Sequence, residues 1–159
     1  MKTSTPVSTT LGSGYFGTVD YLSLPASPAV QLGSSDFTLE AWAYYTTATS
    51  YFHIGSMWDS GKLMWQLDID TSAKTVDFNT SSNGSSSTGD LTGSVLPNTW
   101  NHIAVTRQGN NYKGFLNGVL GYSQTLALAP FDPATRGLVI GSNYATTWGS
   151  GTPVNSVSG

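Results

Sequence analysis

The chain has 159 residues, only 9% of them charged, and no cysteine. This length suits one domain, and the lack of cysteine excludes disulfides and thiolate metal sites. A net charge of −3 with six scattered Lys and Arg residues argues against binding to nucleic-acid phosphates. No segment approaches the roughly 18 apolar residues of a membrane-spanning helix, so we expect neither nucleic acid nor a membrane span.

Residues 1–10 are rich in Ser, Thr and Pro and predict a flexible arm, which leaves residues 11–159 as the folded domain. The rest of the chain shows short alternating segments and no helical period, which predicts an all-β fold. A polar loop is expected at residues 79–90 and a weak strand at 91–96. The other expected strands cover residues 15–24, 36–45, 52–56, 62–70, 74–79, 100–107, 112–116, 119–122 and 137–142.

The segment 100–121 is the most specific of these patterns. Alternation over 100–107 predicts a strand, and residues 109–111 (Gly-Asn-Asn) predict a turn into the next one. Asn117 and Gly118 then predict a two-residue type I′ turn, because both central residues of that turn need a positive φ.

Four blocks in this order resemble laminin-G-like domains of the concanavalin A-like jelly-roll type. They are GTVDYLSLP at residues 17–25, DFTLEAW at 36–42, WNHIAVTRQGNNYKGFLNG at 100–118 and LVIG at 138–141. The resemblance implies an antiparallel β-sandwich of two sheets. It also points to virion and tail-appendage proteins of phages, particularly marine ones, in which such domains recur as repeats.

The family pattern has a closing strand that this sequence does not contain before Gly159. We therefore expect a sandwich with its final strand missing, which exposes an apolar slot and unpaired backbone groups. Either the chain is a fragment of a longer polypeptide, which we favour, or a partner chain donates the closing β-strand.

A catalytic role is not expected. Residues 66–70 (Gln-Leu-Asp-Ile-Asp) are similar to the Glu-x-Asp-x-Glu strand of one glucanase family on this fold, but Gln66 stands at the nucleophile position. An amide cannot form the glycosyl-enzyme ester of a retaining mechanism. The single glutamate, Glu40, and the two histidines, His53 and His102, are expected to have structural roles.

No metal-binding motif is present, and no cofactor is expected. Calcium is the one open alternative, since some relatives bind it at a sandwich edge and aspartates supply the oxygen ligands that it prefers. Asp20 and Asp59 are the least arbitrary candidates, with Asp68 and Asp70 as further oxygen donors.

The aromatic residues carry most of the functional signal. Trp42, Trp65 and Trp100 are expected in core or sheet positions with structural roles. Others cluster near predicted loops beside Asn, Asp and Gly, a composition that suits stacking on sugars or packing against a partner chain. These candidate contacts are Tyr44, Tyr45, Tyr51, Trp58, Tyr144 and Trp148.

The sequence therefore predicts a non-catalytic module on a virion or an extracellular surface. Its expected role is structural or decorative assembly with other virion or surface chains, as a homo-oligomer or as part of a larger assembly. The alternative is a lectin-like adhesion module that binds a cell-surface glycan or receptor. A binder would present the candidate aromatic residues in an open groove, whereas an assembly module would bury them against another chain over about 1,000 Å² or more.

Overall fold

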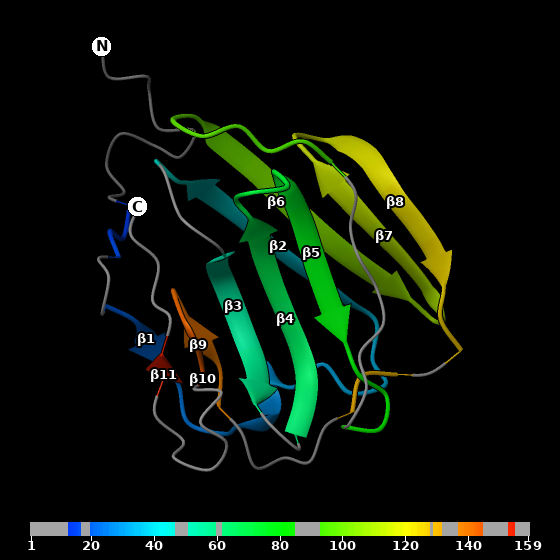
Figure 1. The fold of residues 1–159 in the computed structure, drawn as a ribbon. Helices are drawn as coiled ribbons and strands as arrows, with labels where there is room; N and C mark the ends of the chain where they lie inside the picture. The colour runs from blue at the N-terminus through cyan, green and yellow to red at the C-terminus, as the bar shows by residue number, and fades with distance from the viewer. Residues whose placement is uncertain are drawn as a thin grey trace.

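A computed structural model describes residues 13–16, 20–46, 51–59, 62–84, 93–127, 129–131, 137–144 and 153–154. Within these ranges the fold is almost entirely β, with one short 3-10 helix, η1 (Pro28–Val30) (Figure 1). No helix there is long and apolar enough to span a membrane. The strands are β1 (Leu22–Ser23), β2 (Phe37–Tyr44), β3 (Tyr51–Asp59), β4 (Lys62–Asp70), β5 (Thr75–Thr80), β6 (Trp100–Gln108), β7 (Asn111–Leu116), β8 (Val119–Thr125), β9 (Val139–Ile140), β10 (Asn143–Tyr144) and β11 (Pro153–Val154).

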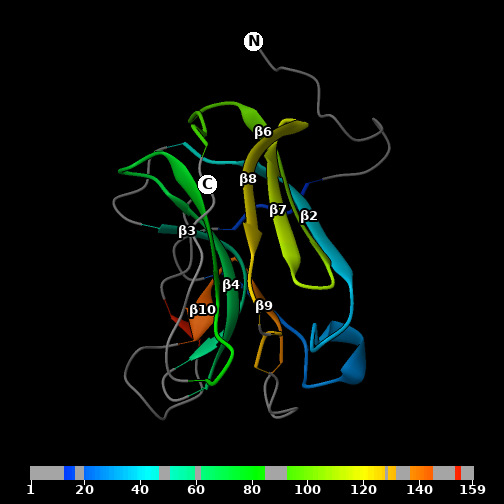
Figure 2. The same ribbon diagram turned by 90° about the vertical axis from the view of Figure 1, so that its right-hand side faces the viewer.

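Two antiparallel sheets pack face to face, as Figure 2 shows from the side. One sheet has five strands in the order β1-β9-β3-β4-β5, and the other has four in the order β2-β6-β7-β8. β10 and β11 form a separate pair, and β10 contacts β3. The predicted two-sheet antiparallel sandwich, consistent with a jelly roll, is confirmed.

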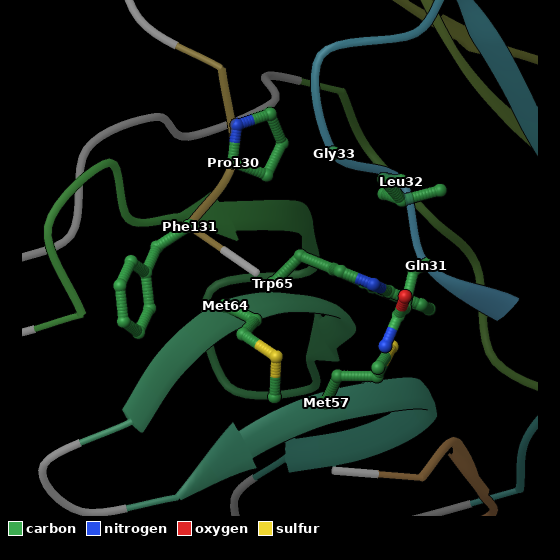
Figure 3. A pocket seen from close by; sticks show the side chains of 8 residues that line it. All are labelled: Gln31, Leu32, Gly33, Met57, Met64, Trp65, Pro130 and Phe131. Carbon is green, nitrogen blue, oxygen red and sulfur yellow. The ribbon is translucent and has the colours of Figure 1, made fainter. Parts of the chain in front are cut away.

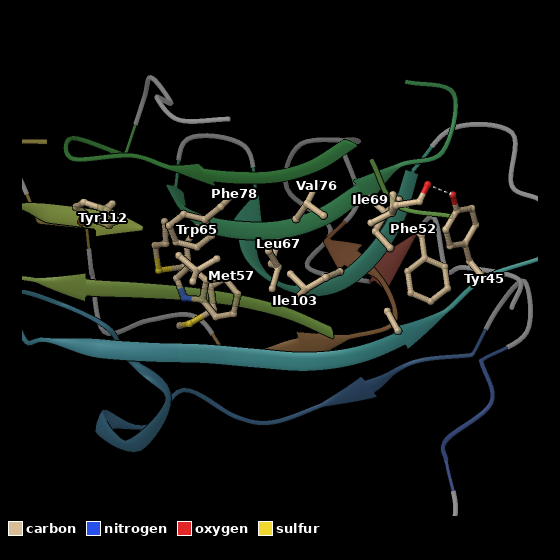
Figure 4. Close-up of a cluster of buried hydrophobic side chains, with 14 residues drawn as sticks. Tyr45, Phe52, Met57, Trp65, Leu67, Ile69, Val76, Phe78, Ile103 and Tyr112 are labelled. Carbon is tan, nitrogen blue, oxygen red and sulfur yellow. Dashed lines mark hydrogen bonds between the residues drawn. The ribbon is translucent and has the colours of Figure 1, made fainter. Parts of the chain in front are cut away.

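The core lies between the sheets and is built from residues of alternate positions (Figure 4). Cross-strand rows such as Phe52, Ile69 and Val76 place directly opposite residues on the same inward face of the five-stranded sheet. β6 and β7 supply the facing side chains from the other sheet, including Ile103, Val105 and Tyr112. Every second side chain of these strands therefore leaves water, which supplies the main driving force for folding.

The β7–β8 hairpin has the predicted turn. Asn117 has a φ of 51° and Gly118 a φ of 80°, the positive values that a type I′ turn needs. The Asn117 side chain also joins the turn to the neighbouring strand, because its Oδ1 accepts the backbone N–H of His102 at 2.8 Å.

Three predicted strands differ from the structure over the described residues, and one of them, at residues 137–142, is limited to β9 (Val139–Ile140). β1 is limited to Leu22–Ser23, although residues 15–24 were expected. Residues 93–96 form no strand, because their backbone groups bond outside any ladder. The Val95 N–H donates to the Lys74 carbonyl, and the Leu96 N–H donates to the Asn101 side chain.

β4 is buried on both faces, although its alternating sequence predicts only that Trp65, Leu67 and Ile69 share one face. Met64, Gln66 and Asp68 on the opposite face are also buried. The centre of this face of the sheet is therefore buried rather than hydrated, and it holds both polar side chains and Met64.

The missing closing strand stays a prediction. In the described part of the chain, β1 and β2 each lie at the edge of a sheet.

Asn101 allows a test of the packing beside β6. Its buried amide donates to the carbonyls of Leu96 and Thr99 at 3.0 and 3.1 Å and accepts the Leu96 N–H at 3.3 Å. An Asn101→Ala change should lower the free energy of unfolding by about 2 kcal/mol, since buried polar groups lose their partners. Urea denaturation measures this. Asn110→Ala, in the exposed β6–β7 turn, is the control, and an equal loss there would contradict the assignment.

Candidate functional site

The outer face of β3, β4 and β5 carries an array of polar side chains in three cross-strand rows. Tyr51, Asp70 and Thr75 form the first row. His53, Asp68 and Asp77 form the second, and Ser56, Gln66 and Asn79 the third. Directly opposite residues of an antiparallel pair point to the same side, so these nine side chains share one surface. We call this surface the polar face.

A buried hydrogen-bond network lies at the centre of the polar face. His53 Nδ1 is 2.6 Å from Asp68 Oδ1, and Gln66 Nε2 is 2.9 Å from His53 Nδ1. The Gln66 amide also hydrogen-bonds Asp68. Asp68 accepts hydrogen bonds from both His53 and Gln66. Because His53 Nδ1 donates its proton to this carboxylate, it cannot also accept from the Gln66 amide, and the Gln66–His53 pair is a close contact. Buried polar groups are stable only when satisfied in this way, so the network fixes all three side chains.

The pKa of Asp68 is raised above its ordinary value. Burial is the main cause, because desolvation disfavours the charged carboxylate of a residue that is 2% exposed. Hydrogen bonds from His53 and Gln66 and the charge of His53 oppose this effect in part. The buried network therefore keeps a carboxyl group where ionisation is costly.

The rim of the polar face is more accessible. Tyr51 is 47% exposed, and its ring stacks on that of His53 with 6.2 Å between centroids and 16° between planes. Thr75, Asp77 and Asn79 on the edge strand β5 are half-buried, and Thr75 Oγ1 donates to Asp77 Oδ1 at 3.2 Å. The rim thus combines one open aromatic ring with carboxylate, amide and hydroxyl groups.

This arrangement suits recognition better than catalysis. Gln66, at the position where the glucanase pattern has its nucleophile, takes part in the network through its amide. Asp68 is nearly inaccessible, whereas a catalytic acid must reach the proton that it transfers.

The structure separates the six predicted aromatic contacts. Tyr45 is a correction: it is 2% exposed, lies in the core and donates its hydroxyl to the Val95 carbonyl at 3.3 Å, so it does not face a ligand (Figure 4). Tyr44 lies at the end of β2 in the other sheet and packs on Trp100. Tyr51 belongs to the polar face.

The remaining three candidates are only partly described. Trp58 lies on β3 and Tyr144 on β10, which contacts β3, but their side chains are outside the described part. Trp148 is wholly outside it. The backbone thus places two more of the predicted aromatic residues on or beside a strand of the polar face.

The calcium candidates are not brought together by any described contact. Asp20 is exposed near β1, and the side chain of Asp59 lies outside the described residues. Among the side chains that the structure places, no three His, Asp or Glu residues converge on a point that would hold a metal ion. Calcium binding by Asp20 and Asp59 stays a prediction.

Sequence reasoning missed His53, Gln66 and Asp68 as one group. Alternation did place Gln66 and Asp68 on the same face of their strand. The missing information was the register between β3 and β4, which sets His53 directly opposite Asp68.

A small hollow lies beside β3 and β4 (Figure 3). It has essentially no enclosed room even for a water molecule, whereas ordinary ligand pockets provide several hundred Å³. Mostly apolar side chains line it, among them Met57, Met64, Trp65 and Phe131. We therefore place the candidate site on the polar face.

A family model described as the concanavalin A-like lectin/glucanases superfamily, Laminin_G_3, matches residues 16–156. The chain belongs to this superfamily. No curated protein sequence matches the chain.

Solved structures with the same fold include carbohydrate-binding proteins. The chain is similar to a putative carbohydrate-binding protein of Bacteroides ovatus, with 20% identity and a TM-score of 0.62 over 90% of this chain and 40% of that one. It is also similar to the CBM40 module of the Ruminococcus gnavus IT-sialidase, with 18% identity and a TM-score of 0.63 over 91% of this chain and 84% of that module. The galectin LEC-6 of Caenorhabditis elegans is 18% identical, with a TM-score of 0.52 over 91% of this chain and 93% of the galectin. These proteins share the fold, and this chain spans 40% of the Bacteroides protein.

Two aspartates of β4 should give opposite pH trends. The raised pKa of Asp68 means that its contribution to stability is largest below the unfolded-state pKa of about 3.9 and is lost as the pH rises through the folded-state pKa. The unfolding free energy of wild type minus that of Asp68→Asn should therefore fall between roughly pH 3 and pH 7.

Asp70 is the matched comparison. Its pKa is lowered by hydrogen bonds from the Ser72 hydroxyl and from the backbone N–H groups of Ala73 and Ser72. The same difference for Asp70→Asn should rise over that interval, because this contribution is lost as the pH falls. Urea denaturation across the pH range measures both, and parallel trends in the two variants would contradict the network.

Proposed function

We propose that this domain binds glycans and that the polar face is its main binding surface. The proposal takes up the adhesion alternative in place of the virion assembly role expected from the sequence. The observation that carries it is the geometry of Tyr51: a half-exposed ring, held parallel to a buried histidine that is itself fixed by Asp68.

A pyranose ring has an apolar C–H side and a rim of hydroxyl groups. The apolar side stacks on an aromatic ring, and the hydroxyls need hydrogen-bond partners around that ring. Stacking on His53 limits the motion of Tyr51 before a ligand arrives. Less conformational entropy is then lost on binding, so the same contact gives a higher affinity.

The other rim residues supply partners for hydroxyl groups. Asp77 and Asn79 lie on the edge strand β5, and Asp70 lies in the same row as Tyr51. A carboxylate accepts several hydrogen bonds at once, so Asp77 can keep its bond to Thr75 and accept from a ligand. Tyr144 remains a candidate for an additional contact, because β10 contacts β3. Trp58 pairs with Leu63 rather than with a polar-face residue, so its role as a contact rests on the sequence alone.

The superfamily and the structural neighbours support this choice. The superfamily includes lectins by its name, and the CBM40 module of Ruminococcus gnavus has been solved bound to α2,3-sialyllactose. Location on a virion or an extracellular surface, and assembly with other chains, remain predictions from the sequence.

A glycan array probed with the purified domain, with and without calcium, tests the proposal. We expect binding to at least one class of glycan, and a loss of roughly tenfold or more in affinity for Tyr51→Ala, because the stacking ring is removed. Isothermal titration with the best glycan measures that loss. Tyr15→Ala removes another exposed tyrosine, outside the strands, and should bind as wild type does.

Absence of binding to every glycan under both conditions would overturn the proposal. Binding that Tyr51→Ala leaves unchanged would instead place the site elsewhere on the domain. Dependence on calcium would support the predicted aspartate site, and Asp20→Asn and Asp59→Asn would then locate it.

A further inference from the structure

The outer face of the four-stranded sheet carries a second group of aromatic side chains. Cross-strand pairing places Trp42 opposite His102, and Tyr44 opposite Trp100, in successive rows of β2 and β6. The next row holds Glu40, Ala104, Phe115 and Leu120. Figure 2 shows the two sheets in profile, so that this surface and the polar face lie on opposite sides of the sandwich. We call this second group the aromatic face.

The aromatic face is partly open to water. Trp42 is 43% exposed, Leu120 is 51% exposed, and Tyr44, Trp100 and Phe115 are half-buried. The rings of Trp42 and His102 are 4.8 Å apart between centroids, and those of Tyr44 and Trp100 are 5.6 Å apart. Packing of each ring on its cross-strand neighbour restrains it on a regular strand, so these rings are fixed before any ligand arrives.

Ionisable groups lie among these rings. Glu40 precedes Trp42 by two residues on the same side of β2, and 66% of its side chain is exposed. Its Oε2 is 3.6 Å from His102 Nε2, and His102 is the residue that packs on Trp42. The exposed indole ring of Trp42 therefore has an imidazole in its own cross-strand row and a carboxylate in the neighbouring row.

This mixture favours a sugar over a protein partner. The buried centre of a protein interface is depleted of charged residues, whereas Glu40 and His102 lie beside the most exposed ring. A pyranose needs an open ring for its C–H side and acceptors at the edge of that ring. Trp42 supplies the first, and the Glu40 carboxylate supplies the second.

We propose that Trp42, His102 and Glu40 form a second glycan-binding site, in which a pyranose stacks on Trp42 and donates hydroxyl hydrogen bonds to Glu40. The inference rests on the proposed function and extends it, because sites on opposite faces make the domain bivalent. A bivalent domain can join two glycan chains, and its apparent affinity for a glycan-coated surface then exceeds that of either site.

Nuclear magnetic resonance can observe both faces in one titration. The indole N–H signal of Trp42, assigned by its loss in Trp42→Phe, reports on the aromatic face, and the backbone amides of Tyr51 and Asp77 report on the polar face. The probes are cellohexaose, laminarihexaose, mannohexaose, xylohexaose, arabinotriose and α2,3-sialyllactose, each added to millimolar concentration. We expect at least one probe to shift the Trp42 signal in wild type and in Tyr51→Ala alike.

Variants then test which side chains bind. Trp42→Ala should weaken binding at the aromatic face roughly tenfold or more, as followed by the Leu120 amide, while Trp42→Phe should retain part of it. Leu96→Ala removes another exposed apolar side chain, outside the strands, and should leave both sites unchanged.

The outcomes separate this inference from the proposed function. Shifts at the polar face alone overturn the second site and leave the proposed function standing. Shifts at the aromatic face alone support the second site and overturn the polar face as the main one. No shift with any probe overturns the second site, and the glycan array then decides the proposed function separately. A further outcome is that no probe shifts the Trp42 signal, while sedimentation shows wild type as a dimer and Trp42→Ala as a monomer. The aromatic face would then bind a second copy of the chain instead of a sugar.

Discussion

Burial of β4 on both faces is the constraint on which the rest of the structure depends. Its inward residues Trp65, Leu67 and Ile69 join the core between the sheets, as an alternating strand requires. Its outward residues Gln66 and Asp68 are buried as well, and burial of unpartnered polar groups costs free energy. Their neighbours therefore have to satisfy them: Asp68 accepts from His53 on β3 and from Gln66 on its own strand.

The same requirement fixes the side chains of the polar face. His53 is held by Asp68, and Tyr51 stacks on His53, so an exposed ring is positioned by a network that is itself out of water. Such support is what a binding site needs, since a ring held only by its own strand would lose more rotational freedom on binding. The buried residues His53 and Asp68 thus determine how firmly the exposed Tyr51 ring is held.

The two outer faces of the sandwich differ in chemistry. The five-stranded sheet presents a polar network with one ring at its rim, whereas the four-stranded sheet presents successive pairs of rings with a single carboxylate among them. Glu40 and His102 are the ionisable residues in the central rows of the aromatic face, and the other side chains of these rows are apolar or aromatic. Trp42 and Tyr51 lie on opposite sides of the sandwich, so the two proposed sites are separate.

The sequence by itself determined the all-β class, most strand positions and the turn at Asn117 and Gly118, because these follow from alternation and from local backbone preferences. Alternation over residues 36–45 also puts Glu40 and Trp42 on one side of their strand. Only the tertiary structure decided which side chains meet across strands and which are reached by water. Register between strands is a long-range property, so the pairs of His53 with Asp68 and of Trp42 with His102 cannot be read from either segment alone. Burial is equally non-local: Tyr44 and Tyr45 are neighbours in sequence, yet one packs on an outer face and the other in the core.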